Sequence, residues 1–440
     1  MQDQQERTLA VGVELTSTPR PNSGAIELEP DTEESLQELA TLADSAGARV
    51  VGQMLQMRRA LDSATLVGSG KVEEIKERIA ADEVETVIFD YDLTPTQLRN
   101  LERRLGVKVL DRTQLILDIF ARRARTSEGQ LQVELAQLNY LLPRLAGRGT
   151  QMSRLGGGIG TRGPGETQLE TDRRRIGRRI AKLKAELERV RATRGVQRSQ
   201  RQAVPLSTVS LVGYTNAGKS SLFNRLTGAD VLADAKMFAT LDPTVRQIRL
   251  PSQRRVLLSD TVGFIRNLPT TLVDAFRATL EEVTAAALLL HVADITSPVI
   301  AEQTSHVLKV LGEIGAEGTS QILVLNKADQ LDAAERSQDL ETLTHRILGE
   351  TARQNATQAV LISAQTGEGI LELLDTIDKH LRQDPVERQR FRLPLGEGRA
   401  LHLLHDRAAV LSKHYQDDYC EVVADAPQSI RERLAEFAVD

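Results

Sequence analysis

One loop settles the architecture of this chain: Gly213-Tyr214-Thr215-Asn216-Ala217-Gly218-Lys219-Ser220. An apolar run at 208–212 precedes it and a helix-like segment at 221–226 follows it, and the loop has the complete spacing G-x-x-x-x-G-K-[ST]. In such a loop, backbone N–H groups and the helix N-terminus surround phosphate oxygens. We therefore expect Lys219 to reach the β- and γ-phosphates of a nucleotide and the Ser220 hydroxyl to bind Mg²⁺.

The identity of the base is indicated by a second motif. An apolar run at 321–325 ends in Asn326-Lys327-Ala328-Asp329, the N-K-x-D pattern of GTPases, at the carboxyl end of a predicted strand. A carboxylate can accept both adjacent donors on the edge of guanine, so Asp329 is expected to select that base. Asn326 is expected to brace the base and the loop, with the stem of Lys327 on the ring face.

Three further segments complete the predicted GTP site. Asp260-Thr261-Val262-Gly263 has the D-x-x-G pattern: Asp260 is expected to hold Mg²⁺ through water, and the Gly263 N–H to touch the γ-phosphate. Before it, a predicted mobile loop contains Thr240, the candidate for a second hydroxyl ligand of Mg²⁺, with Thr244 as the alternative. This loop reads Phe238-Ala239-Thr240-Leu241-Asp242-Pro243-Thr244. Ser363-Ala364-Gln365 is similar to the S-A-K loop that contacts guanine through backbone amides, with Gln365 in place of lysine.

The predicted catalytic residues are Lys219, Gly263 and Asn216. Ras-like enzymes place a glutamine after D-x-x-G to orient the attacking water, whereas this chain has Phe264, which cannot bond water. We therefore expect slow intrinsic hydrolysis that a partner stimulates. Two interpretations of Asn216 stay open: it recruits K⁺ near the phosphates, or it bonds only loop backbone. The first predicts faster turnover in K⁺ than in Na⁺.

Composition places the chain among ordinary globular proteins. It has 440 residues, enough for roughly three domains of about 150 residues each. It is 40% hydrophobic and 27% charged, with a net charge of −5, so nucleic-acid binding would have to come from local patches. The single cysteine, Cys420, excludes an internal disulfide and suits a reducing cytoplasm. No secretory signal or transmembrane stretch is expected, because the most apolar run, 285–293, is too short to span a bilayer.

The chain as a whole divides into four predicted domains: an α/β domain at 8–110, a helical hairpin at 111–204, the GTPase domain at 205–384, and a small α+β domain at 385–440. In the first, strands are predicted at 8–15, 48–55, 84–90 and 108–110, with a helix over 31–46. In the last, we predict a helix over 399–413, a strand over 419–424 and a closing helix over 429–437. The fold class is thus α/β, with a doubly wound, mostly parallel sheet in the P-loop GTPase domain.

The hairpin carries the strongest positive charge. Leu131, Leu135, Leu138 and Leu142 follow one another at helical spacing, which predicts a packed face. A glycine-rich loop with basic residues, 156–166, separates this helix from a long one over 167–202. One face of the long helix is apolar, and the other is rich in arginine and lysine from Arg173 to Arg194. The loop and this face suit contact with an RNA backbone, the alternatives being a plain linker and a solvated surface.

Two weaker patterns also occur. Val67-Gly68-Ser69-Gly70-Lys71 has glycines and a lysine without the full phosphate-loop spacing, which makes it a weak candidate for a second nucleotide site. His402, His405 and His414 have no constellation of carboxylates or cysteines around them, so solvated histidines are expected rather than a metal site.

The whole pattern resembles the HflX family of translational GTPases. The resemblance covers about residues 8–385 and is carried by the phosphate loop with 238–243, by 111–125 and 129–138, and above all by Gly157-Gly158-Ile159-Gly160-Thr161-Arg162-Gly163-Pro164-Gly165-Glu166 with the residues that follow to 174. It implies a cytoplasmic GTPase, stimulated by the ribosome, that binds the large ribosomal subunit and its RNA and splits stalled or idle ribosomes under stress. It also implies that 157–166 reach toward the peptidyl-transferase region. Nothing in the sequence demands a dimer, so we expect a monomer.

Two other functions remain open. One is an ATP-dependent RNA-remodelling enzyme with a regulatory GTPase domain, for which Gly68–Lys71 is the only support. The other is an assembly or scaffold protein that binds GTP but barely turns it over, which Phe264 would permit.

Overall fold

The computed structural model describes residues 5–15, 32–145, 164–202, 206–228, 237–238, 240–252, 254–266, 280, 282–332, 340–348, 358–382, 386–395, 397–416 and 418–439. The chain forms two compact units. The first comprises Met1–Leu187, Asp234–Leu241 and Asn267–Arg277, and the second Glu188–Ala233, Asp242–Arg266 and Ala278–Asp440. Residues 156–163 of the glycine-rich loop and Ala239 lie outside the described residues.

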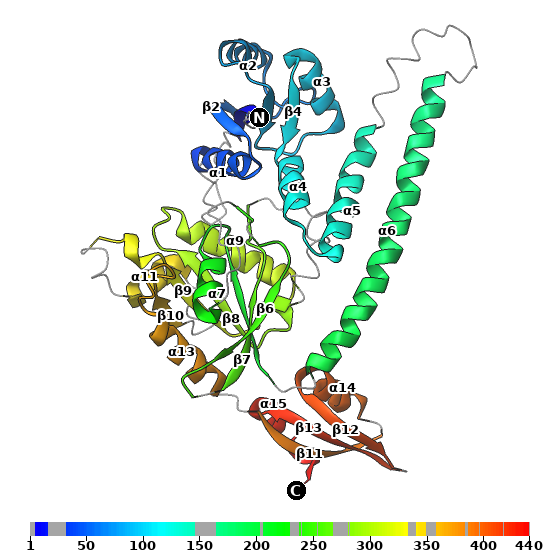
Figure 1. Cartoon of the computed structure of the whole chain (residues 1–440), viewed down its shortest axis with the longest axis vertical. Helices are drawn as coiled ribbons and strands as arrows, with labels where there is room; N and C mark the ends of the chain where they lie inside the picture. Colours follow the sequence, from blue (N-terminus) through cyan, green and yellow to red (C-terminus); the bar gives the residue numbers. More distant parts are fainter. Residues whose placement is uncertain are drawn as a thin grey trace. The chain divides into compact units, whose positions relative to one another are not determined.

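The first unit begins with a parallel sheet of β1 (Arg7–Leu15), β2 (Arg49–Arg58), β3 (Thr86–Phe89) and β4 (Lys108–Asp111), in the order β2-β1-β3-β4 (Figure 1). Helices α2 (Ser69–Ala81) and α3 (Pro95–Leu105) pack on it through Val72, Ile75 and Leu101. Helices α1 (Thr32–Ser45) and α4 (Arg112–Arg123) pack against each other and against the sheet. The predicted strands and the first helix are therefore confirmed to within a few residues.

Local sequence explains where these helices begin and end. Thr94 and Gln97 form a reciprocal capping box at the start of α3, and Pro95 occupies the first helical turn, where no N–H is needed. Gly106 ends α3 with φ of 73°, a conformation that glycine adopts without strain. The buried Asp111 carboxylate accepts the Gln114 N–H at 2.8 Å and so caps α4.

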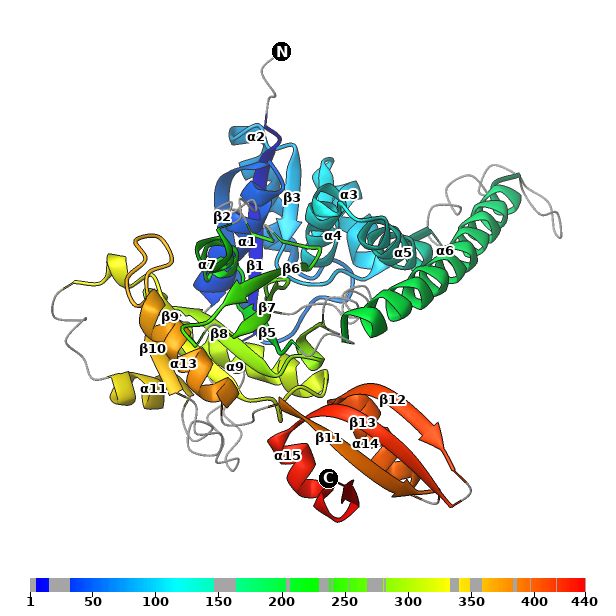
Figure 2. The ribbon, with the colours of Figure 1, turned by 60° about the horizontal axis from the view of Figure 1, so that its bottom comes forward.

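Helices α5 (Ser127–Arg144) and α6 (Pro164–Gln202) lie side by side (Figures 1 and 2), joined by a bidentate ion pair between Arg179 and Glu134 with both distances 2.6 Å. The apolar face predicted for the long helix is confirmed, since Leu183 and Leu187 are buried. The packed face predicted for α5 is wrong in detail. Its four leucines are only half-buried, and the buried positions include Val133, Ala136 and Tyr140.

The second unit contains a six-stranded sheet in the order β10-β9-β8-β5-β7-β6. The strands are β5 (Thr208–Gly213), β6 (Thr244–Arg249), β7 (Arg255–Asp260), β8 (Leu288–Asp294), β9 (Gln321–Asn326) and β10 (Gln358–Leu361). Only the edge strand β6 is antiparallel, so the mostly parallel sheet is confirmed. Helices α7 (Lys219–Thr227) and α13 (Ile370–Arg382) share one core with the sheet, and α9 (Ile300–Glu313) and α11 (Leu340–Leu348) share another.

A separate antiparallel sheet ends the chain, formed by β11 (Val386–Pro394), β12 (Ala409–Tyr415), β13 (Tyr419–Pro427) and β14 (Ala438–Val439) in the order β12-β13-β11-β14 (Figure 2). Helices α14 (Gly398–Arg407) and α15 (Gln428–Arg433) cover its apolar face through Leu404 and Ile430. The helix predicted over 399–413 is wrong in its second half, because Ala409–Tyr415 pair with β13 instead. None of the described helices is long and apolar enough to cross a membrane.

Candidate GTP-binding site

The sheet of the second unit brings the predicted motifs to one edge. Strands β5, β7, β8 and β9 are parallel, so their carboxyl ends meet, and these ends carry Gly213, Asp260, Asp294 and Asn326. This edge of an open α/β sheet is where ligands bind. Motifs far apart in the sequence are therefore neighbours in the fold.

The phosphate loop needs its glycines for close approach of other groups. A Cβ on Gly213 would lie 2.1 Å from the Val292 carbonyl oxygen. Gly218 has φ of 92°, and a Cβ there would lie 2.2 Å from the Asn326 side-chain nitrogen. A Cβ on Gly263, in the D-x-x-G segment, would lie 2.8 Å from the Thr215 side chain and 3.0 Å from the Lys219 Nζ. The loop and the D-x-x-G segment therefore pack directly against each other.

Lys219 begins helix α7 and is buried. Its Nζ donates to the carbonyl oxygens of Gly213 at 3.0 Å and Tyr214 at 2.7 Å. Burial lowers the pKa of Lys219 to about 8, while the Asp260 carboxylate opposes the shift. A desolvated ammonium held against the loop gains strongly from a nearby anion, as a phosphate would provide.

Two residues predicted to hold the metal ion, Ser220 and Asp260, are in direct contact. The Ser220 hydroxyl donates to Asp260 Oδ2 at 2.8 Å, and Asp260 is fully buried. Hydroxyl and carboxylate oxygens are the ligands that Mg²⁺ prefers, so this pair fits that ion. Thr261 and Val262 follow in a buried segment, with the Thr261 hydroxyl bonded to the Leu211 carbonyl at 2.6 Å.

Phe264 holds the phosphate loop with its backbone. Its N–H donates to the Gly213 carbonyl at 3.0 Å, and its carbonyl accepts the Thr215 N–H at 2.8 Å. The Tyr214 hydroxyl accepts the Arg266 N–H at 3.0 Å, which extends the same contact. The side chain of Phe264 is buried, so this residue is built into the wall of the site. The sequence pattern indicated only that Phe264 cannot bond water.

Two residues of the loop stand out by their surroundings. Thr215 is only 6% exposed, and among the described residues its hydroxyl has no hydrogen-bond partner. A buried hydroxyl in that condition is uncommon and marks a place where a ligand atom can bond. Asn216 is exposed and has φ of 62°, a left-handed conformation that asparagine tolerates better than most residues. Ala217 is buried beneath the loop.

The N-K-x-D and S-A-Q segments are joined to each other and to the phosphate loop. Asn326 donates from Nδ2 to the Ala217 carbonyl at 2.9 Å and accepts the Ala364 N–H at 2.9 Å. The Ser363 hydroxyl donates to Asp329 Oδ1 at 2.6 Å. Lys327, with φ of 70°, pairs with Asp294 at the end of β8, and Ala328 is buried. One asparagine thus bridges all three loops.

Arg225 is a contributor that the motifs did not reveal. From α7, its Nε donates to the Ala364 carbonyl at 3.0 Å, and its guanidinium also bonds the Gln365 carbonyl. It therefore holds the S-A-Q loop through backbone, the part of that loop predicted to contact guanine. The sequence indicated this role of Arg225 only by its place six residues after Lys219, on the helix that follows the phosphate loop.

The segment before β6 divides between the two units. Phe238, Thr240 and Leu241 are buried and belong to the first unit, whereas Asp242 and the half-buried Thr244 belong to the second. The two candidates for the second metal ligand, Thr240 and Thr244, therefore lie in different units.

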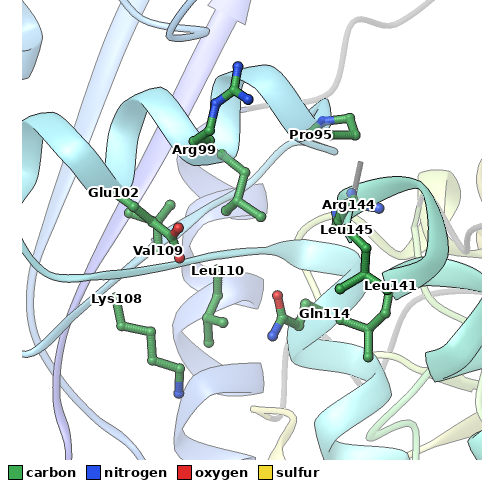
Figure 3. Close-up of a pocket in the computed structure, with 11 residues that line it drawn as sticks. Pro95, Arg99, Glu102, Lys108, Val109, Leu110, Gln114, Leu141, Arg144 and Leu145 are labelled. Carbon is green, nitrogen blue, oxygen red and sulfur yellow. The ribbon is translucent and has the colours of Figure 1, made fainter. Parts of the chain in front are cut away.

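In the described residues, neither of the two weaker sequence patterns, Gly68–Lys71 and the three histidines, forms a comparable site. Gly68 precedes α2, its N–H donates to Gln56 Oε1 at 3.0 Å, and Lys71 is paired with Glu74 at 2.7 Å. A cavity of about 280 Å³ lies in the same unit between α3, β4 and the end of α5 (Figure 3), but Gly68–Lys71 do not line it. His402, His405 and His414 are exposed, and no group of three or more possible metal ligands occurs in the described part of the chain.

Four protein-family models match successive, partly overlapping parts of the chain. Residues 33–121 match a family described as GTP-binding GTPase N-terminal, and 123–201 match the GTP-binding GTPase middle region. Residues 208–327 match a family described as 50S ribosome-binding GTPase, and 274–383 match the elongation factor Tu GTP-binding domain.

Individual relatives extend along most of the chain. A GTP-binding protein from Sulfolobus solfataricus, solved with GDP, is 27% identical with a TM-score of 0.46, covering 86% of this chain and 99% of that one. GTPase HflX of Caldanaerobacter subterraneus is 46% identical over 415 residues, covering 94% of this chain and 92% of that protein. GTPase HflX of Escherichia coli is 46% identical over 385 residues, covering 88% of each. With these two HflX proteins 46% identical along nearly its full length, the chain belongs to the HflX family of GTPases and is a GTP hydrolase.

Proposed function

We propose that this GTPase binds the large ribosomal subunit and uses GTP hydrolysis in splitting or recycling stalled or idle ribosomes under stress. The observation that carries the proposal is the exposed basic surface of α6. Its exposed bases include Arg173, Arg174, Arg175, Arg178, Lys182 and Lys184. Leu183 and Leu187 are buried, so the helix packs through its apolar face and leaves these bases exposed. The matching family's description as a 50S ribosome-binding GTPase supports the same partner.

We assign the nucleotide contacts as follows. Lys219 and the backbone of the phosphate loop hold the phosphates, Ser220 and Thr240 ligand Mg²⁺, and Asp260 reaches it through water. Asp329 selects guanine, with Asn326 and the S-A-Q backbone in support. The remaining contacts assigned are those of Gly213, Tyr214, Thr215, Asn216, Ala217, Gly218, Phe238, Ala239, Leu241, Asp242, Thr261, Val262, Gly263, Lys327, Ala328, Ser363, Ala364 and Gln365. When bound, Mg²⁺ supplies positive charge against the phosphates.

Catalysis then depends on Lys219, Gly263 and Asn216. Phe264 fills the place of a water-orienting side chain, so the free enzyme is expected to be slow and the ribosome to complete the site. The Asn216 side chain is exposed on the phosphate loop. We assign it the recruitment of K⁺, which would act where an arginine finger acts in other GTPases. Faster turnover in K⁺ than in Na⁺, lost on Asn216→Ala, tests this part.

The test of the whole proposal is GTP turnover with and without purified large ribosomal subunits in K⁺ buffer. We expect a large stimulation, and its loss when residues 157–166 are replaced by a neutral linker of equal length. The same neutral linker inserted between the exposed residues Glu317 and Gly318 is the matched control. Unchanged turnover with ribosomes present would instead favour a scaffold that binds GTP and barely hydrolyses it.

We also propose that the four domains predicted at 8–110, 111–204, 205–384 and 385–440 act together in one monomer in the cytoplasm. Sedimentation of the full-length protein, with and without GTP, tests the monomer. ATP-stimulated RNA unwinding that survives Lys219→Ala would instead favour the RNA-remodelling enzyme.

A further inference from the structure

The segment that carries Thr240 is held by the N-terminal α/β region rather than by the GTPase sheet. Residues Asp234–Leu241 belong to the first unit, although the chain before 234 and after 241 belongs to the second. Within this segment Met237, Phe238 and Leu241 are all nearly inaccessible, at 7%, 3% and 5% exposed. A loop that was merely solvated would leave such side chains in water at considerable cost.

Two contacts of its described residues, Met237 and Phe238, show how the segment is held. The rings of Phe238 and Phe120 meet edge to face, with centroids 4.6 Å apart and an interplanar angle of 79°. Phe120 is fully buried in α4. Beside it, the Met237 N–H donates to the hydroxyl of Ser45, the last residue of α1, at 2.9 Å. Two helices of the N-terminal region therefore contact two adjacent residues of the loop. Helix α4 contacts the side chain of Phe238, and α1 contacts the backbone of Met237.

The backbone of Phe238 is strained in this docked position. Its φ is 57°, a left-handed conformation that bulky residues rarely adopt and that persists only when surrounding contacts enforce it. Enforced strain of this kind is typical of loops whose conformation matters for binding. Thr240 lies two residues further on, so the conformation set at Phe238 determines where its hydroxyl can reach.

We propose that Phe238, docked on Phe120 beside the hydrogen bond from Met237 to Ser45, is a positioning residue for Thr240 and couples occupancy of the GTP site to the N-terminal α/β region. The proposal rests on the assigned role of Thr240 as a ligand of Mg²⁺. Docking orders the loop before GTP arrives, so less conformational entropy is lost on binding. Because coupling is reciprocal, GTP with Mg²⁺ must in turn stabilise the docked α4. GDP lacks the γ-phosphate that recruits this loop, so binding of GDP does not depend on the contact between Phe238 and Phe120.

The experiment measures affinity of the full chain for a non-hydrolysable GTP analogue and for GDP, both with Mg²⁺. For Phe238→Ala we expect analogue affinity to fall about tenfold, the range of one or two ordered residues, with GDP affinity unchanged. Phe238→Leu should restore part of the loss. Combining Phe238→Ala with Phe120→Leu should add nothing further, because both variants remove one contact. Phe89→Leu is the matched control, a fully buried phenylalanine of the same unit that lies outside this contact.

Hydrogen exchange of α4 gives a readout that loss of stability alone would not produce. In the wild type the GTP analogue should slow exchange in α4 and GDP should not, and in Phe238→Ala the difference should vanish. Analogue affinity equal to or tighter than wild type in Phe238→Ala would overturn the proposal, as would α4 exchange that ignores the nucleotide. A wild-type protein that binds neither nucleotide would refute the assigned GTP site instead, so the two failures are distinguishable.

Discussion

At the scale of single residues, Gly218 shows how tightly the nucleotide site is built. Its φ of 92° and the 2.2 Å that would separate a Cβ from the Asn326 side chain make any side chain there disruptive. Gly218→Ala should displace Asn326, break its bond to Ala217, and abolish binding of both GDP and GTP. We expect a loss of stability of about 2 kcal/mol or more, measured by urea unfolding.

Gly177→Ala is the matched control for that experiment. Gly177 lies in the middle of α6, where an added Cβ would meet nothing within 4 Å among the described residues. Alanine there should leave nucleotide binding unchanged and stabilise the helix by up to about 1 kcal/mol. Equal nucleotide affinity in the two variants would contradict the close approach of Asn326 to the loop.

His291 makes the GTPase sheet sensitive to acid. It lies in the middle of β8, only 2% exposed, and burial together with the charge of Lys219 lowers its pKa to about 4. Between pH 6.5 and 4 the unfolded chain therefore binds more protons at this residue than the folded one, and the free energy of unfolding falls as pH falls. The contribution of His291 to the free energy of unfolding should be about 2 kcal/mol lower at pH 5 than at pH 7.5.

His291→Leu, which cannot titrate, should remove that part of the pH dependence. The measurement is urea unfolding of both proteins at pH 7.5 and pH 5, followed by a probe in the GTPase sheet. Other groups titrate in the same range, so the difference between the two proteins is the relevant quantity. The same loss of stability in both would show that His291 is not the acid-sensitive group.

The meeting of the candidate motifs at one sheet edge was predictable from sequence. Gly213, Asp260 and Asn326 each end an apolar run, and parallel strands bring such ends together, as observed. What spacing could not predict were contacts made through backbone. The Thr215 N–H bonds the carbonyl of Phe264, which any residue type could supply, and the Arg225 guanidinium bonds carbonyls of the S-A-Q loop, which carry no side-chain signal.

At the scale of elements, local pattern decided some segments and pairing decided others. Helix α3 carries its own start and stop signals in Thr94, Pro95 and Gly106, so its bounds follow from the sequence. Residues 409–413 have the pattern of a continued α14, yet they form β12 because β13 offers a ladder from Tyr415 to Ala409, with one irregularity between Val410 and Ser412. Local pattern does not predict the edge strand β6 for the same reason, since its pairing with β7 is tertiary.

The exposed bases of α6 carry the prediction that belongs to this scale. Arg173, Arg175 and Arg178 are exposed, so reversing all three to glutamate should leave folding and GTP affinity unchanged. Binding to large ribosomal subunits should weaken strongly, and its dependence on salt should become shallower, because fewer phosphates are neutralised. Binding measured across a KCl series gives both quantities.

The matched control reverses three exposed bases of the same unit outside α6: Lys76, Arg103 and Arg104. The change in net charge is identical, so a general electrostatic effect would weaken both variants alike. An equal loss of ribosome binding in the two would count against α6 as the contact surface.

At the scale of the whole molecule, the hydrophobic cores are separate. One core contains Leu9, Phe89 and Val109 of the first unit, another contains Leu211, Phe223 and Val324 around the GTPase sheet, and a third contains Phe391 and Leu404 near the C-terminus. Independent cores unfold as independent units unless something couples them. The segment Asp234–Leu241 belongs to the first unit while its neighbours in sequence belong to the second, and it carries the coupling proposed for Phe238.

Calorimetry of the full chain should therefore show more than one transition. A non-hydrolysable GTP analogue with Mg²⁺, at about 100 times its Kd, should stabilise the GTPase core by about 2.7 kcal/mol and raise its transition by several degrees. If Phe238 couples the units, the transition of the N-terminal core rises as well, and in Phe238→Ala only the GTPase transition moves. GDP should raise the GTPase transition alone in both proteins. A single transition that shifts as a whole with either nucleotide, in Phe238→Ala as in the wild type, would mean that the cores unfold together and that Phe238 is not what joins them.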